Sequence, residues 1–416
     1  MNASPAKMMP ATHRYTSLAV FLLGALSLIV PSGYSVGAAL LLGAGGVLLC
    51  RRQVPSLTGR DRALMATMAM FALFWMLRAL ADGQGVGGWD KPSRFLLAVP
   101  ALLWVMARPP GLAWMWSGLA CGAISAGGWA AWQKLIQGVG RADGFTFVIQ
   151  FGNLSMLLGV LCLAGLGWAV KQPQRRRWSA LLLLGALMGI LGSLFSGSRG
   201  GWVGIPFILL VLYRGYGEFL SGRLKVAVLG AILLGGGLVY GLPQTGVQSR
   251  VDHAVEDVQG YFIDGDARSS VGARFEMWRG AAHLLVDKPL FGWGDNGYEQ
   301  GMQALADDGV VSEYVTRYGH AHNEFIDAFA KRGVIGLGLL LALYLVPMRL
   351  FARRFSEPDL EVRSIAVAGV LLSVAYIDFG LSQVFMAHNS GVMMFAFWLA
   401  TFYGVLRAHE SSHLIR

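Results

Sequence analysis

The heptapeptide Gly319-His320-Ala321-His322-Asn323-Glu324-Phe325 stands where a long polar segment gives way to an apolar helix predicted near residues 325–347. Ionisable groups are costly at the mouth of such a helix and are therefore more often functional than accidental. We expect Asn323 to be the N-cap, with Glu324 in the first turn. His322 then faces the positive end of the helix dipole, which favours the neutral imidazole that a general base needs. The alternative is that His322 only packs and hydrogen-bonds at the helix entry.

Outside the heptapeptide the chain is strongly apolar. Of its 416 residues, 55% are hydrophobic and 14% are charged, whereas a soluble domain carries roughly 25% charged residues. The apolar residues form long blocks between short charged loops, as in helical proteins that cross a membrane many times. Cys50, Cys121 and Cys162 are scattered in or beside these blocks, so we expect neither a disulfide framework nor a zinc site.

About twelve apolar blocks are candidate membrane spans, and the sequence therefore predicts an all-α polytopic membrane protein. The first block is interpreted as a span and not as a signal peptide, because no convincing cleavage site follows it. The blocks lie near residues 15–30, 34–50, 62–81, 93–107, 112–133, 150–170, 178–196, 200–213, 223–241, 325–347, 362–385 and 389–407.

Basic residues are spread unevenly over the loops between these spans. If the N-terminus is cytoplasmic, the cytoplasmic loops hold most of them, including the run Arg175-Arg176-Arg177. By the positive-inside rule, this pattern predicts that both termini face the cytoplasm. The net charge of +10 then reflects topology and does not indicate nucleic-acid binding. The short loops on the opposite side hold Lys91, Arg94, Lys134, Arg141 and Arg199.

One outward loop is much longer than the others and divides the chain. Residues 1–240 carry the first nine predicted spans, residues 241–322 form the large loop, and residues 323–416 carry three spans and a cytoplasmic tail. Loops of this length are usually functional. Helical spacing of apolar residues within 273–286 predicts an amphipathic helix at the membrane surface, with Phe275, Trp278, Ala282 and Leu285 on its apolar face.

Arginines on the outward side are candidate anion-binding groups. Arg199 lies in the turn S-G-S-R-G-G-W of residues 196–202, whose glycines let backbone amides approach a phosphate closely. The alternative is a hairpin turn whose arginine meets lipid headgroups. Arg274 and Arg279 lie on the predicted amphipathic helix, and Arg274 is the less neutralised of the two. Here the alternative is a solvated helix face.

Other polar groups have weaker assignments. Asp264-Gly265-Asp266 forms a D-x-D triplet, which can hold a divalent metal in sugar-nucleotide glycosyltransferases, but its setting favours a loop turn. No third metal-ligating residue stands at a recognisable spacing from His320 and His322, so we expect no bound metal ion. A polar cavity or an ion pair near the outward ends of the spans could involve Arg78, Asp378, Gln383, His388 and Asn389.

The order of these motifs resembles the O-antigen ligase and polymerase superfamily. The matching features are the S-G-S-R-G-G-W turn, R-F-E-M-W before P-L-F-G-W-G in the large loop, and H-N-E-F followed by K-R-G-V-I-G at residues 331–336. No single motif is specific, whereas their order and spacing are. Within the superfamily the chain looks most like an O-antigen ligase.

The resemblance implies a C-type glycosyltransferase-like fold in the bacterial inner membrane, with the large loop and the active site in the periplasm. The activity would be transfer of a glycan from undecaprenyl diphosphate to a sugar hydroxyl of lipid A core, with inversion and without a metal or other cofactor, in lipopolysaccharide biosynthesis. The implied partners are the lipid-linked glycan, lipid A core and membrane lipids. Arg199 and Arg274 match the arginines that bind the donor diphosphate, and His322 matches the histidine near the acceptor hydroxyl.

Supporting residues and rival functions complete the expectations. Glu324 or Asp327 could orient His322 or replace it as the base, and His320, Asn323 and Arg279 could support the site. The nearest rivals are an O-antigen polymerase and a protein O-oligosaccharyltransferase, which differ in the acceptor. A transporter is a more distant rival, because no repeat or pair of broken helices is found.

Overall fold

The computed structural model describes residues 10–198, 200–242 and 247–413. The secondary structure of these residues is helical throughout, and each predicted span overlaps one of the helices. The elements, with η marking short 3₁₀ turns, are α1 (Ala11–Ala25), α2 (Tyr34–Cys50), α3 (Gly59–Ala81), η1 (Gly85–Trp89), α4 (Asp90–Ala107), α5 (Leu112–Leu135), α6 (Val148–Ala164), α7 (Leu166–Ala169), α8 (Arg175–Ser196), η2 (Gly200–Trp202), α9 (Ile205–Tyr216), η3 (Gly217–Phe219), α10 (Gly222–Gly241), α11 (Val247–Asp264), α12 (Ser270–Asp287), α13 (Gly294–Asp307), η5 (Glu313–Val315), α14 (Glu324–Ala352), α15 (Leu360–Gly380), η6 (Phe385–Ala387) and α16 (Asn389–His413).

Six helical segments among the described residues are long and apolar enough to cross a membrane. They confirm a multi-pass membrane protein, while the number of twelve spans and their orientation remain predictions. The six segments are Gly59–Ala81, Val148–Ala169, Arg175–Ser196, Glu324–Ala352, Leu360–Gly380 and Asn389–Glu410.

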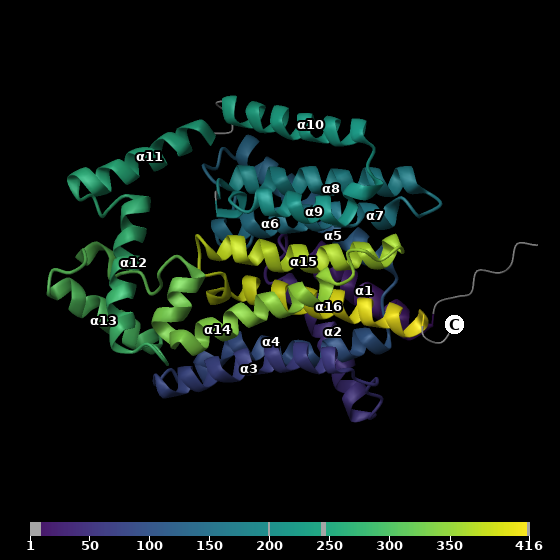
Figure 1. Ribbon diagram of the computed structural model, residues 1–416, viewed down its shortest axis with the longest axis horizontal. Coiled ribbons are helices and arrows are strands. Elements are labelled where there is room, and N and C mark those ends of the chain that lie inside the picture. The colour runs from purple at the N-terminus through teal and green to yellow at the C-terminus, as the bar shows by residue number, and fades with distance from the viewer. Residues whose placement is uncertain (1–9, 199, 243–246, 414–416) are drawn as a thin grey trace, which may run out of the picture.

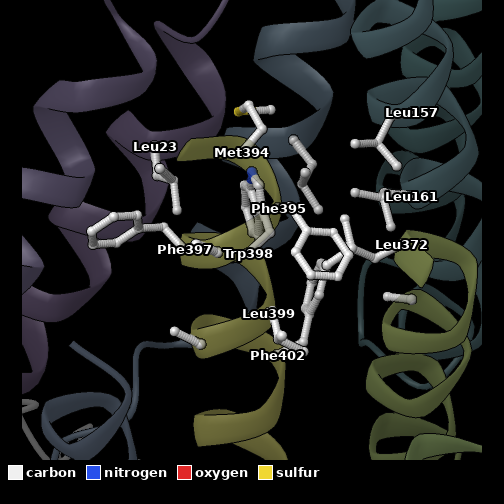
Figure 2. Close-up of a cluster of buried hydrophobic side chains, with 14 of the residues drawn as sticks. Leu23, Leu157, Leu161, Leu372, Met394, Phe395, Phe397, Trp398, Leu399 and Phe402 are labelled. Carbon is white, nitrogen blue, oxygen red and sulfur yellow. The ribbon is translucent and has the colours of Figure 1, made fainter. Parts of the chain in front are cut away.

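The apolar helices run side by side in a layered bundle, with α16 near its centre (Figure 1). Figure 2 shows Phe395, Trp398 and Phe402 of α16 between Leu23 of α1 on one side and Leu161 of α6 and Leu372 of α15 on the other. The side chain of Trp398 is completely buried. An apolar helix that is buried on all sides belongs to the interior of a large bundle, so α16 organises the packing of the helices around it.

Helices α11, α12 and α13 gather at one end of the bundle, beside the start of α14 (Figure 1). They share a second apolar cluster, in which Met277 of α12 packs with Tyr298 and Met302 of α13. The buried face of α12 differs from the one expected from the sequence: Ala282 is exposed, while Ala281 and Leu284 are buried. The reason is that α12 packs against α13 and the following loop.

Helix α14 is broken at Gly333, where the backbone has φ +66° and ψ −170°. Residues 289–293 fill the break. The amide of Val334 donates to the Pro289 carbonyl at 2.8 Å, and the amide of Trp293 donates to the Ala330 carbonyl at 3.0 Å. A Cβ at Gly333 would lie 2.2 Å from the carbonyl carbon of Leu290. The P-L-F-G-W-G and K-R-G-V-I-G motifs therefore form one structural joint between the large loop and α14.

Candidate active site

Asn323 is the N-cap of α14, as the sequence predicted. Oδ1 of Asn323 accepts hydrogen bonds from the amides of Phe325 at 3.0 Å and Ile326 at 3.1 Å. Its Nδ2 donates to the carbonyl of Leu381 at 3.2 Å. Because an N-cap satisfies amides that have no partner within the helix, Asn323 fixes both the start of α14 and its contact with the loop after α15.

His322 has the backbone conformation φ +48°, which is uncommon for a residue other than glycine and often marks a functional site. Its ring lies 4.2 Å from that of His320, between centroids. The amide of His322 donates to Nδ1 of His320 at 3.3 Å. A neutral imidazole that accepts at Nδ1 carries its proton at Nε2, so His320 presents an N–H donor.

Both histidines are poor proton acceptors in the absence of substrate. Burial, the charge of Lys331 and the neighbouring His388 lower the pKa of His320 to about 4. Burial, His320 and the charge of Arg274 lower the pKa of His322 to about 3, against a smaller rise from a hydrogen bond with Gln383. Nδ1 of His322 is buried and has no hydrogen-bond partner among the described atoms. Both rings are therefore neutral at pH 7.

Helix α12 brings Arg274 to the heptapeptide. Nε1 of Trp278 donates to the carbonyl of Ala321 at 2.9 Å, which fixes α12 against the His-Ala-His segment. Arg274 lies one helical turn before Trp278, and its charge acts on the ring of His322. The structure thus brings Arg274 close to His320 and His322, which stand far beyond it in the sequence.

Asp327 and Glu324, in the first turn of α14, each contact a backbone amide, although Oε1 of Glu324 is buried without a hydrogen-bond partner among the described atoms. Oδ1 of Asp327 accepts from the amide of Ala321 at 3.1 Å and lies 3.2 Å from Nζ of Lys331. Oε2 of Glu324 accepts from the amide of Met386 at 2.9 Å, and this side chain is fully buried. Asp327 therefore positions the backbone between the histidines, and Glu324 anchors the loop before α16.

The two other candidate arginines have different standings. Arg199 lies outside the described residues. Arg279 is exposed and lies 3.5 Å from Glu276. The same glutamate accepts hydrogen bonds from the hydroxyl of Tyr261 and the amide of Ser312, so Arg279 belongs to a network that joins α11, α12 and the loop before η5.

The D-x-D triplet forms a turn, and Arg78 and Asp378, both among the described residues, do not form an ion pair with each other. Asp264 ends α11, and Oδ1 of Asp266 accepts from the amide of Arg268 at 2.9 Å, as in a turn. The guanidinium of Arg78 donates to the carbonyl of Gly292 at 3.2 Å. The Asp378 carboxylate instead lies beside Gly204.

Tyr318 is a site residue that the sequence did not single out. Its ring lies 5.6 Å from that of His322, and its hydroxyl accepts from the guanidinium of Arg317 at 2.8 Å. Arg317 also stacks on Tyr314, with 3.7 Å between Cζ and the ring centroid. In the sequence, Tyr314, Arg317 and Tyr318 stand just before the heptapeptide. This grouping of aromatic and basic residues is the sequence feature that could have indicated their place in the site.

Gln383 and His388 join the site from the loop between α15 and α16. Nε2 of Gln383 lies 3.4 Å from Nε2 of His388, and Gln383 is also the hydrogen-bond partner of His322. Burial and the charge of Lys91 lower the pKa of His388 to about 4. Gln383 and His388, which the sequence suggested could share a polar cavity with Arg78 and Asp378, therefore lie next to the histidine pair.

A cavity of about 570 Å³ opens beside His320. Its walls come from α3, η1, α13 and α14, with further residues from the start of α4, from η6 and from the adjoining loops. It contains six ionisable residues besides His320: Asp90, Lys91, Asp295, Asp327, Lys331 and Arg332. This volume falls within the roughly 300–1,000 Å³ typical of small-molecule sites.

The helices and the site define a multi-pass membrane protein with a histidine and arginine site at one end of the bundle. Residues 184–341, which run from α8 into α14, match the family described as O-antigen ligase. This match confirms the resemblance to the O-antigen ligase and polymerase superfamily, whose members are glycosyltransferase-like enzymes that process lipid-linked glycans. An uncharacterized protein of Haemophilus influenzae is 27% identical over 367 residues, which cover 88% of this chain and 91% of that protein.

Proposed function

We propose that this protein is an O-antigen ligase of the bacterial inner membrane. It transfers a glycan from undecaprenyl diphosphate to a sugar hydroxyl of lipid A core at the periplasmic face, inverting the anomeric centre without a metal. The observation that carries the proposal is the neutral His322 held beside Arg274 at the mouth of α14, within the segment that matches the ligase family.

The arginines supply the charge that the leaving group requires. The bond between the anomeric carbon and the diphosphate oxygen breaks, and its electron pair leaves with the diphosphate. Arg199 and Arg274 neutralise this charge through hydrogen bonds from their guanidiniums, which remain charged at any working pH. An anion bound beside Arg274 also offsets the positive charge that lowers the pKa of His322, so donor binding makes His322 a stronger base.

His322 is the proposed general base. The acceptor hydroxyl oxygen forms the new bond to the anomeric carbon, and its proton passes to His322, whose Nδ1 has no hydrogen-bond partner among the described atoms. Such a base commonly contributes about 10²–10⁴ in rate. The engagement of Asp327 with the amide of Ala321 and with Lys331 favours His322 over that carboxylate. His320, Asn323 and Asp327 position His322, and Arg279 acts only through the fold of the large loop.

Transfer by the purified protein in detergent tests the proposal. The donor is an undecaprenyl-diphosphate glycan, offered in separate reactions with lipid A core, with donor alone, or with an acceptor protein. We expect product only on lipid A core. Extension of the donor glycan alone would show a polymerase, and glycan on the protein would show an oligosaccharyltransferase. No transfer to any acceptor, with uptake of the donor into protein-containing vesicles, would show a transporter.

A further inference from the structure

The cavity beside His320 has balanced charge. Lys331 lies 2.8 Å from Asp295 and 3.2 Å from Asp327, and Asp90 lies 2.6 Å from Arg94. Arg332 stacks over Trp75, with 4.5 Å between Cζ and the ring centroid. Besides His320, the walls carry three acidic residues, Asp90, Asp295 and Asp327, and three basic ones, Lys91, Lys331 and Arg332, so their formal charges cancel. A cavity of this kind does not select an anion.

The same walls are rich in groups that hydrogen-bond to hydroxyls. The side-chain amides of Gln84 and Asn296, the backbone of Gly87 and the ring of His320 all line it. Nε2 of Gln84 donates to Asp82 and Asp295, and Nδ2 of Asn296 donates to the Asp82 carbonyl. Because His320 accepts the His322 amide at Nδ1, its ring offers a donor at Nε2. Polar groups arranged in a pocket of about 300–1,000 Å³ favour a polyhydroxylated ligand over an apolar one.

The two histidines differ in their surroundings. Among the described residues, His320 lines the cavity and His322 does not, whereas the charge of Arg274 acts on His322. An inverting displacement requires the attacking oxygen and the leaving group on opposite faces of the sugar. If the diphosphate lies with Arg274, the acceptor must approach from the far side of the histidines.

We propose that the cavity between η1, α13 and His320 is the binding site for the acceptor saccharide, a neutral sugar. One of its hydroxyls is held by Nε2–H of His320, and its attacking hydroxyl is presented to His322, whose ring centroid lies 4.2 Å from that of His320. This inference rests on the proposed transfer to a sugar hydroxyl and adds the place and chemistry of the acceptor. The donor's own glycan is the competing occupant, and kinetics can separate the two.

Gly87 offers a way to fill the cavity without disturbing the fold. It lines the cavity, and a Cβ added there would meet nothing within 4 Å. Gly140 is a matched control, because it lies in another loop, is exposed, and would also accept a Cβ without contact. The test compares Gly87→Trp with Gly140→Trp, with Gly87→Leu as a milder replacement if the larger side chain prevents folding.

The measurements are KM for each substrate in the transfer reaction and direct binding of core oligosaccharide freed from lipid A. For Gly87→Trp we expect KM for the acceptor to rise at least about tenfold, KM for the donor to stay within about twofold, and oligosaccharide binding to be lost. Gly140→Trp should match wild type. An unchanged acceptor KM, or a rise confined to the donor KM, would overturn the inference while leaving the proposed function intact.

Binding remains informative if the transfer reaction fails. If wild type transfers nothing, the proposed ligase activity is refuted, yet oligosaccharide binding that disappears only in Gly87→Trp would still support a saccharide site. Absence of oligosaccharide binding by wild type, or equal binding by Gly87→Trp, would remove the site.

Discussion

Lys331 of α14 and Asp295 of α13 form an ion pair, with 2.8 Å between Nζ and Oδ1. Burial raises the pKa of Asp295, but the charges of Lys331 and Arg332 outweigh it and hold that pKa below its ordinary value. The same ammonium donates to the carbonyl of Gly319 at 2.7 Å. One buried cation therefore joins the large loop, the heptapeptide and α14.

Replacing this cation should destabilise the protein. Lys331→Met leaves Asp327, whose side chain is 2% exposed, as a buried carboxylate without its main partner. Breaking such a pair costs about 3 kcal/mol. We expect a clear decrease in Tm in detergent, whereas Lys171→Met, which changes an exposed lysine, should have the Tm of wild type. Equal Tm values for the two variants would show that the pair does not stabilise the joint.

Gly333 should not tolerate a side chain. Its backbone lies at φ +66° and ψ −170°, a region that costs other residues about 1–3 kcal/mol, and an added Cβ would clash with Leu290. Gly333→Ala should therefore lower Tm and expression. Gly338→Ala is the matched control in the same helix, because a Cβ there meets nothing within 4 Å. A Gly333→Ala variant as stable as this control would contradict the described break in α14.

The pH dependence of transfer should respond to Arg274. Burial comes first in lowering the pKa of His322 to about 3, but the Arg274 charge adds to it. Arg274→Gln removes that charge, so the pKa rises and His322 becomes protonated at a higher pH. The acid limb of kcat/KM should therefore move to higher pH, and kcat/KM itself should fall. Arg268→Gln, an exposed arginine of the large loop, should leave the profile in place, and an identical shift in both variants would argue against a specific effect.

The D-x-D triplet should be dispensable for chemistry. Asp266 is engaged by the amide of its neighbour Arg268, so we expect Asp266→Asn to retain transfer, with an effect on stability of less than about 1 kcal/mol. Divalent-ion chelation should leave wild-type transfer intact. Loss of transfer under chelation, restored by added metal and mimicked by Asp266→Asn, would assign this triplet a metal-dependent role.

Local patterns predicted the helices and the entry to α14 well. Apolar blocks fix where helices form, and the Asn323 cap follows from residue type and position alone. The buried face of α12 did not follow, because neighbouring apolar positions such as Leu284 and Leu285 are equivalent until a packing partner is known. The sequence of the large loop does not reveal that α13 is that partner.

The site was predictable only in part, because its contacts join distant segments. His320 and His322 were found from their unusual setting, and Arg274 from its place on the predicted amphipathic helix and from the resemblance. The contact of Asp327 with Lys331 agrees with helical spacing, whereas the ion pair of Lys331 with Asp295 depends on the docking of α13. Tertiary contacts of this kind leave no local pattern.

The most direct test of the central claim is single-turnover transfer from an undecaprenyl-diphosphate glycan to lipid A core by wild type, His322→Gln and His283→Gln. His283 is an exposed histidine of α12 and serves as the matched control. We predict that His322→Gln lowers the rate by about 10²–10⁴, with donor binding and Tm unchanged, and that His283→Gln matches wild type. A His322→Gln rate within about threefold of wild type, below any loss expected for a general base, would contradict the assignment of His322 as the base.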